Sequence, residues 1–173
     1  MTINGTSVLT ETIFQRSKRL GTVLQDADGQ FVGLTCAEDI AFALENDCVP
    51  QQVMIERVNE VARIVEMEAF LDQSPYDLSG GQKQKVALAG VLVDNVDILL
   101  FDEPLANLDP ASGKTTIELI DQLHQNYNKT IIIIEHRLED VLERALEPAV
   151  SCRAVPHSGP ATQVIALTLL RIG

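Results

Sequence analysis

The fold is decided by the stretch VDILLFDEP, residues 96–104, in which an apolar run ends in two carboxylates and a proline. A second apolar run, KTIIII, occupies residues 129–134. Continuous branched apolar runs of this kind are typical of strands buried on both faces of a parallel sheet. Residues 111–127 between them carry apolar side chains at helical spacing. The region therefore predicts strand, helix and strand, joined as a right-handed crossover.

The residues upstream and downstream extend this α/β pattern. Residues 20–24 predict a short buried strand that ends at Gln25, and turn-forming residues follow at 26–30. Helical spacing of apolar side chains predicts four further helices, over residues 35–44, 51–71, 79–93 and 137–146. The chain is therefore expected to form an α/β fold around a parallel core sheet.

The composition disfavours several classes of protein. Among 173 residues, 13 Lys and Arg stand against 25 Asp and Glu, a formal net charge of −12, and 46% of the residues are hydrophobic. Such a chain is a poor candidate for binding nucleic acid or anionic lipid directly, because both need basic patches. No apolar run is long enough to cross a bilayer, and no signal peptide is visible. Three cysteines without paired or metal-ligand spacing fit a reducing cytosol.

The two carboxylates that end the first apolar run, Asp102 and Glu103, are candidate functional residues. The carboxyl end of a buried parallel strand is where α/β proteins place ligands. Adjacent side chains on a strand point to opposite sides, so the two carboxylates should have different roles. One could hold Mg²⁺ through water, and the other could orient or deprotonate an attacking water. Taken alone, however, the pair also fits an ordinary solvated strand end.

The segment LSGGQ, residues 78–82, is a more specific signal. Its glycines let a ligand approach the backbone, Ser79 can cap the following helix, and N–H groups at a helix N-terminus form an anion site. In isolation it also fits an ordinary capped helix start. It is accompanied by Asn107–Asp109 after the carboxylates and by His136 after the second apolar run.

These signals, in this order, resemble the nucleotide-binding subunits of ABC transporters over roughly residues 1–145. The matching residues are Gln25 for the Q-loop glutamine, Ser79, Gly80, Gly81 and Gln82 for the signature motif, Asp102 for the Walker B aspartate, Glu103 for the catalytic glutamate, Asn107–Asp109 for the D-loop, and His136 for the switch histidine.

The resemblance implies a P-loop NTPase-like parallel core sheet with a helical signature subdomain at about 35–95, and hydrolysis of ATP with Mg²⁺. It implies that Glu103 polarises the attacking water and that His136 contacts the γ-phosphate. It assigns the magnesium ion to Asp102 and Gln25. It assigns nucleotide binding to Ser79, Gly80, Gly81, Gln82 and Asp109.

Residues 25–32, 35–42 and 135–139 are further similar to the energy-coupling-factor and cobalt-type importer ATPases. Ala27, where that group often has proline, and Lys85, where it usually has arginine, depart mildly from the pattern. The similarity implies uptake of a vitamin, a vitamin precursor or a transition-metal ion. The implied partners are a second ATPase subunit, identical or paralogous, and transmembrane transporter subunits. The expected location is cytoplasmic, peripheral on the inner face of the cell membrane.

The Walker A loop, G-x-x-x-x-G-K-[ST], is not found in the chain; the nearest match, at Gly113 and Lys114, has Leu108 where the first glycine is required. We therefore expect a partial ABC ATPase domain over 1–147, N-terminally incomplete and truncated before the Q-loop region. An atypical, poorly ordered tail is expected over 148–173, which has no Asp or Glu. Loss of an interior strand should leave unpaired edges beside the apolar strands and lower stability.

Two alternatives remain open. The first is a non-catalytic module that only completes a partner's ATP site or docks to membrane subunits. The second is an ABC ATPase of DNA repair or chromosome organisation. It ranks last, because residues 26–78 hold neither heptads nor cysteine pairs and the charge is acidic.

Overall fold

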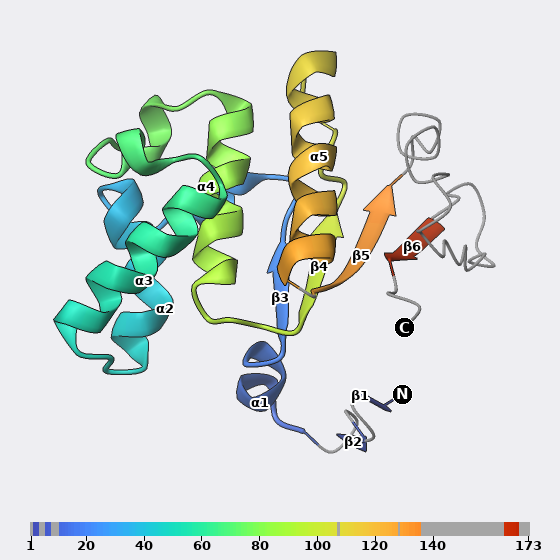
Figure 1. Ribbon diagram of the computed structural model, residues 1–173, viewed down its shortest axis with the longest axis horizontal. Helices are drawn as coiled ribbons and strands as arrows, with labels where there is room; N and C mark the ends of the chain where they lie inside the picture. Colours follow the sequence, from blue (N-terminus) through green and yellow to red (C-terminus); the bar gives the residue numbers. More distant parts are fainter. Residues whose placement is uncertain are drawn as a thin grey trace.

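The computed structural model describes residues 2–3, 6–7, 11–106, 108–127, 129–135 and 165–169. Its main sheet has the strand order β3-β4-β5-β6. The strands are β3 (Leu20–Val23), β4 (Ile98–Asp102), β5 (Thr130–Glu135) and β6 (Ile165–Leu169), with a small hairpin of β1 (Thr2–Ile3) and β2 (Thr6–Ser7) (Figure 1). The first three strands of the sheet are parallel, and β6 is antiparallel to β5. The predicted parallel core is thus present.

Helices cover this sheet and form a lobe beside it (Figure 1). The helices are α1 (Ile13–Ser17), α2 (Cys36–Asn46), α3 (Gln51–Ile64), α4 (Gly80–Leu92) and α5 (Pro110–Tyr127), with 3-10 turns η1 (Ala27–Gln30), η2 (Glu68–Phe70) and η3 (Pro75–Asp77). Helices α2, α3 and α4 pack against one another, α4 contacts β3, and α5 contacts β5. Gly21 permits the close approach of α4, since a Cβ there would lie 2.0 Å from Cγ1 of Val91.

Burial of the central strands is one-sided. Leu99, Phe101, Ile131 and Ile133 are at most 2% exposed, whereas the residues between them are half-buried. The expectation of strands buried on both faces is therefore met on one face only. The physical reason is that α4 and α5 both lie against the face that carries Leu99, Phe101, Ile131 and Ile133, so this face is buried more deeply than the other.

The predicted helix over 51–71 is wrong in its second part, because α3 ends at Ile64. Glu66 has a φ of 60°, in the left-handed region that continues no helix. The N–H of Met67 donates to the carbonyl of Ala62 at 2.8 Å, and the N–H of Glu66 donates to that of Arg63 at 3.2 Å. These two bonds form a Schellman motif, which closes the helix and turns the chain.

The expected unpaired edges beside the apolar strands are also wrong. Strand β4 lies between β3 and β5, and β5 lies between β4 and β6, so each is paired on both sides. The second partner of β5 is β6, which comes from the segment 148–173. The helix expected over 137–146 and the rest of the segment 148–173 lie outside the described residues.

Candidate functional site

Three strand ends bring the predicted carboxylates to one edge of the sheet. Val23 pairs with Phe101, and Asp102 pairs with Ile134, so β3, β4 and β5 end side by side. Gln25 follows the end of β3 with an exposed side chain, while Asp102 and Glu103 are half-buried at the end of β4. His136, the expected contact for the γ-phosphate, follows β5 but lies outside the described residues, as does Asn107.

Glu103 leaves the sheet in a constrained backbone conformation. Its φ is 48°, a left-handed value that is uncommon for any residue other than glycine. Its N–H donates to the carbonyl of Ile134 at 2.8 Å, and its carbonyl accepts from the N–H of Ala106 at 3.1 Å. Because β4 ends at Asp102, a turn rather than the pleat separates the two carboxylates, which corrects the expectation that strand alternation does so.

The signature segment starts α4 with a reciprocal capping box. Oγ of Ser79 accepts from the N–H of Gln82 at 3.4 Å, and Oε1 of Gln82 accepts from the N–H of Ser79 at 2.9 Å. The N–H groups of Gly80 and Gly81 have no acceptor within the part of the chain that the structure describes. Two backbone donors at the positive end of a helix thus remain for an external anion.

Asp109 serves the start of α5. Its Oδ1 accepts from the N–H groups of Ala111 and Ser112 at 3.0 and 3.1 Å, and its Oδ2 accepts from Oγ of Ser112 at 2.5 Å. The hydrogen bonds from Ser112 hold the pKa of this carboxyl below its ordinary value. The two helix starts touch here, since a Cβ on Gly81 would lie 3.4 Å from Cβ of Ser112.

Two ion pairs that the sequence did not predict join α4 to neighbouring elements. Nζ of Lys83 lies 2.8 Å from a carboxylate oxygen of Asp28 in η1, and Nζ of Lys85 lies 2.9 Å from one of Glu66 after α3. Both acidic partners are exposed, so solvent screens the pairs and each contributes little to stability. No spacing rule connects residues so far apart, so these pairs could not be predicted from the sequence.

The residues present fit Mg²⁺ and phosphate chemistry in a limited sense. No group of three described His, Cys, Asp or Glu side chains is placed to hold a metal ion. Mg²⁺, however, is usually bound through one or two carboxylates, phosphates and water, and Asp102 can supply a carboxylate. Lys114, the nearest match to a phosphate-loop lysine, is exposed on α5 and lies 3.9 Å from Glu118, as expected for a solvated helix residue.

No helix among the described residues is both long and apolar enough to pass through a lipid bilayer.

Relatives by sequence carry one common description. The chain is 62% identical over 140 residues to a protein of Clostridium perfringens assigned as an ABC transporter ATP-binding protein; the match covers 81% of this chain and 25% of that protein. It is 58% identical over 147 residues to a protein of Streptococcus mutans with the same assignment, and the match covers 85% of this chain and 26% of that protein. The chain therefore spans about a quarter of the length of these curated relatives.

Solved structures agree with the fold. CbiO1 from Clostridium perfringens, part of the ABC transporter complex CbiONQ, superposes with a TM-score of 0.77 at 30% identity, covering 81% of this chain and 57% of that one. The ATP-binding cassette MJ0796 was solved as a dimer bound to ADP and phosphate after hydrolysis. It superposes with a TM-score of 0.66 at 26% identity, and the match covers 80% of this chain and 62% of that one. The expected α/β fold of an ABC ATPase, a parallel sheet with helices, is confirmed.

The family model described as ABC transporter matches residues 1–106, which include β3, the signature segment and both carboxylates. The chain belongs to the ABC transporter family.

Proposed function

We propose that this chain is part of an ATP-binding and ATP-hydrolysing subunit of an ABC-type importer. The observation that carries the proposal is the contact between two helix starts: the open first turn of α4 lies against the D-loop segment that opens α5. An anion-binding helix start and a carboxylate pair at a strand end are the two features that nucleotide hydrolysis needs from this region.

At the strand ends, Glu103 is assigned to polarising the attacking water. Its backbone is fixed by Ile134 and Ala106, so its carboxylate starts from a defined position. Asp102 and Gln25 are assigned to a magnesium ion, which when bound neutralises charge on the phosphates. His136 is assigned to the γ-phosphate. Its place in the chain, directly after β5, supports the assignment.

At the start of α4, Ser79, Gly80, Gly81 and Gln82 are assigned to nucleotide binding. The backbone donors of the two glycines support this, because they are the first-turn groups that the capping box leaves open. Asp109 belongs to the same site as a positioning residue, since its carboxylate is occupied by the start of α5 and holds Ser112 beside Gly81. The nucleotide would lie between this surface and a second ATPase subunit, identical or paralogous.

The transported substrate is proposed to be a vitamin, a vitamin precursor or a transition-metal ion. Similarity to CbiO1, a component of a transporter complex, supports an importer of this kind. Transmembrane subunits would hold the protein at the inner, cytoplasmic face of the membrane. Leu24, Val32 and Leu34, around the loop that contains Gln25, are 44%, 62% and 82% exposed, which suits contact with such protein partners.

The test combines the chain with an ABC subunit that supplies a Walker A loop and measures phosphate release from ATP. We expect hydrolysis that falls at least about 100-fold in Glu103→Gln. Glu118→Gln, which removes an exposed carboxylate on α5, should leave the rate unchanged. Hydrolysis that survives Glu103→Gln would overturn the catalytic assignment.

A second candidate is a non-catalytic module that completes a partner's ATP site. The open first turn of α4 supports it, because its backbone donors can face a nucleotide held by a partner without any contribution from Glu103. Titration with labelled ATP separates the two functions. Nucleotide binding and hydrolysis that need only the partner's own catalytic glutamate, and not Glu103, would favour the module.

A further inference from the structure

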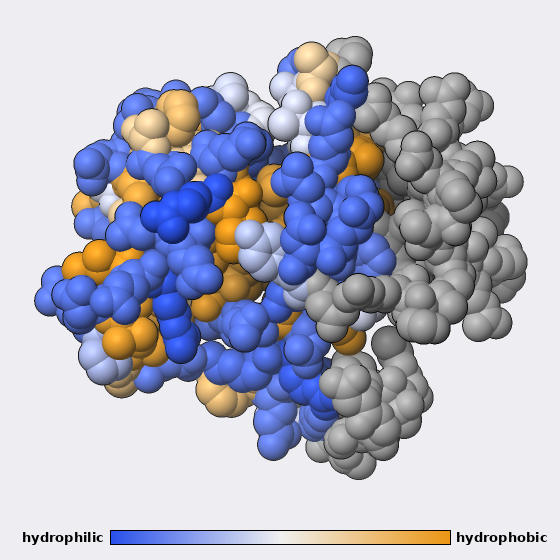
Figure 2. Space-filling model, in the orientation of Figure 1, coloured by the Kyte–Doolittle hydropathy of each residue, from blue (hydrophilic) through white to orange (hydrophobic). Residues whose placement is uncertain are grey.

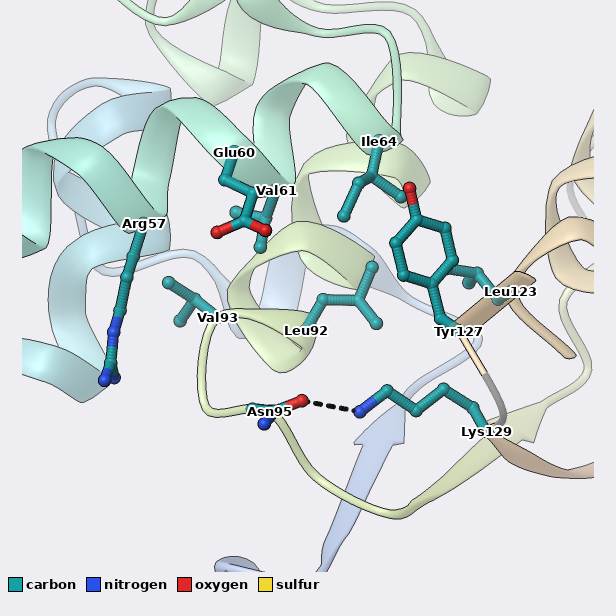
Figure 3. A pocket seen from close by; sticks show the side chains of 10 residues that line it. All are labelled: Arg57, Glu60, Val61, Ile64, Leu92, Val93, Asn95, Leu123, Tyr127 and Lys129. Carbon is teal, nitrogen blue, oxygen red and sulfur yellow. Dashed lines mark hydrogen bonds between the residues drawn. The ribbon is translucent and has the colours of Figure 1, made fainter.

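A cavity of about 250 Å³ lies between the helical lobe and α5, and no role proposed above uses it (Figure 3). Figure 2 shows apolar surface at the bottom of the hollow between these two parts. The lining residues come from α3, from the end of α4 and its following loop, and from the end of α5 with Lys129: Arg57, Glu60, Val61, Ile64, Leu92, Val93, Asn95, Leu123, Tyr127 and Lys129.

This cavity lies at the opposite edge of the sheet from the carboxylates. Asn95 and Lys129 precede the first residues of β4 and β5, whereas Asp102 and Glu103 lie at the end of β4. The cavity is therefore separate from the proposed nucleotide site, and its occupancy does not depend on the proposed function.

Lys129 gives the cavity a cation held at a fixed position. Its Nζ donates to Oδ1 of Asn95 at 2.8 Å and to the carbonyl of Val96 at 2.7 Å, both neutral acceptors (Figure 3). An ammonium has three donors, so one remains. Among the described residues, no carboxylate lies within ion-pair distance of it. Burial lowers the pKa of Lys129, and only the charge of Asp97 opposes the shift.

The rest of the cavity divides into an apolar floor and a polar rim. Val61, Ile64, Leu92 and Leu123 form the floor, together with the ring of Tyr127. The exposed side chains of Arg57 and Glu60 stand at the rim on α3, so the charged lining residues carry two positive charges and one negative charge. A molecule with an apolar body and one anionic group complements this arrangement.

We propose that the cavity is a binding site for a small organic carboxylate with an aromatic or branched aliphatic body. The carboxylate accepts from the third donor of Lys129, and the body packs on Leu92 and Leu123. Charge complementarity selects the anion, and the small volume limits the ligand to a fragment-sized molecule. Because α3 and α5 both line the cavity, a bound ligand joins the helical lobe to the helix that covers the sheet.

The probes are 3-phenylpropionate, its uncharged amide and 3-phenylpropylamine, titrated into the full chain and followed by methyl NMR. We expect shifts at Leu92 and Leu123 with 3-phenylpropionate and a dissociation constant of about 1 mM, typical of a ligand of this size. The amide should bind at least about tenfold more weakly, and the amine should not bind, because each lacks the charge that Lys129 pairs with.

Variants locate the charge. Lys129→Met should weaken binding of 3-phenylpropionate about tenfold, and Lys129→Arg should retain most of it. At the exposed rim, the native Arg57 attracts the anion and the native Glu60 repels it. Arg57→Gln should therefore weaken binding about twofold, and Glu60→Gln should strengthen it about twofold. Equal binding of the carboxylate and the amide by the wild-type chain, or shifts confined to other methyl groups, would overturn the proposal. The comparison of carboxylate and amide on the wild-type chain tests the proposal even if Lys129→Met does not fold.

Discussion

Helices α4 and α5 begin beside each other, yet their first turns are satisfied in opposite ways. At the start of α5, the Asp109 carboxylate accepts from Ala111 and Ser112, so the helix carries its own anion. At the start of α4, the neutral side chains of Ser79 and Gln82 cap only each other's N–H groups. The partial positive charge of a helix start is thus cancelled in one case and left available in the other. The difference supports the proposal that α4, rather than α5, is the helix that receives a phosphate.

The largest effect should come from giving α4 the anion that α5 already has. In Gly81→Asp, a carboxylate would occupy the open first turn, and hydrolysis with a partner that supplies the Walker A loop should fall at least about 100-fold. The melting temperature should not fall, since an acidic residue stabilises the first turn of a helix.

Two further variants separate charge from bulk in this experiment. Gly81→Ala adds only a Cβ, which would lie at an ordinary 3.4 Å from Cβ of Ser112, and should reduce the rate far less. Gln122→Asp adds the same charge to an exposed position of α5 and should not change the rate. A rate unchanged by Gly81→Asp would mean that the start of α4 receives no phosphate.

The sequence predicted the start of α4 and the carboxylates at the end of β4 because the information is local. Ser79 and Gln82 stand at capping-box spacing, and Asp102 and Glu103 end an apolar run, so both features could be placed without a structure. Strands β3 and β4 end side by side, which puts Gln25 and the carboxylates at the same end of the sheet.

What could not be predicted depends on distant residues or on backbone strain. The end of α3 depends on Glu66 taking a left-handed φ without glycine, while the apolar spacing of a helix continues past it. Strand β6 pairs with β5 across the segment between them, and no local pattern signals that pairing. The residues that line the cavity beside Lys129 are spread over the sequence between positions 57 and 129, so no local pattern indicates it.

A smaller effect should follow from removing the caps themselves. Ser79→Ala should lower the free energy of unfolding by about 1 kcal/mol and the melting temperature by about 3 °C, because one cap bond is lost. Asp109→Ala should lower the melting temperature further, since three hydrogen bonds end on its carboxylate. Thermal unfolding followed by circular dichroism measures both. A larger loss for Ser79→Ala would show that α4, not α5, depends more on its cap.

The smallest effect is a pH dependence that only α5 should show. Hydrogen bonds from Ser112 and Ala111 lower the pKa of Asp109 from its ordinary value of 3.8, so the unfolded chain binds this proton first as the pH falls. Its contribution to stability is complete well above pH 3.8 and is lost as the pH falls through the lowered pKa of the folded state. The melting temperatures of the wild-type chain and Asp109→Asn should therefore differ at pH 7 and converge toward pH 3.

Asp72→Asn, which removes an exposed carboxylate outside the helix starts, should show no such convergence. A constant difference for Asp109→Asn would mean that the charge of Asp109 does not stabilise the start of α5, and the contrast with α4 would then rest on hydrogen bonding alone.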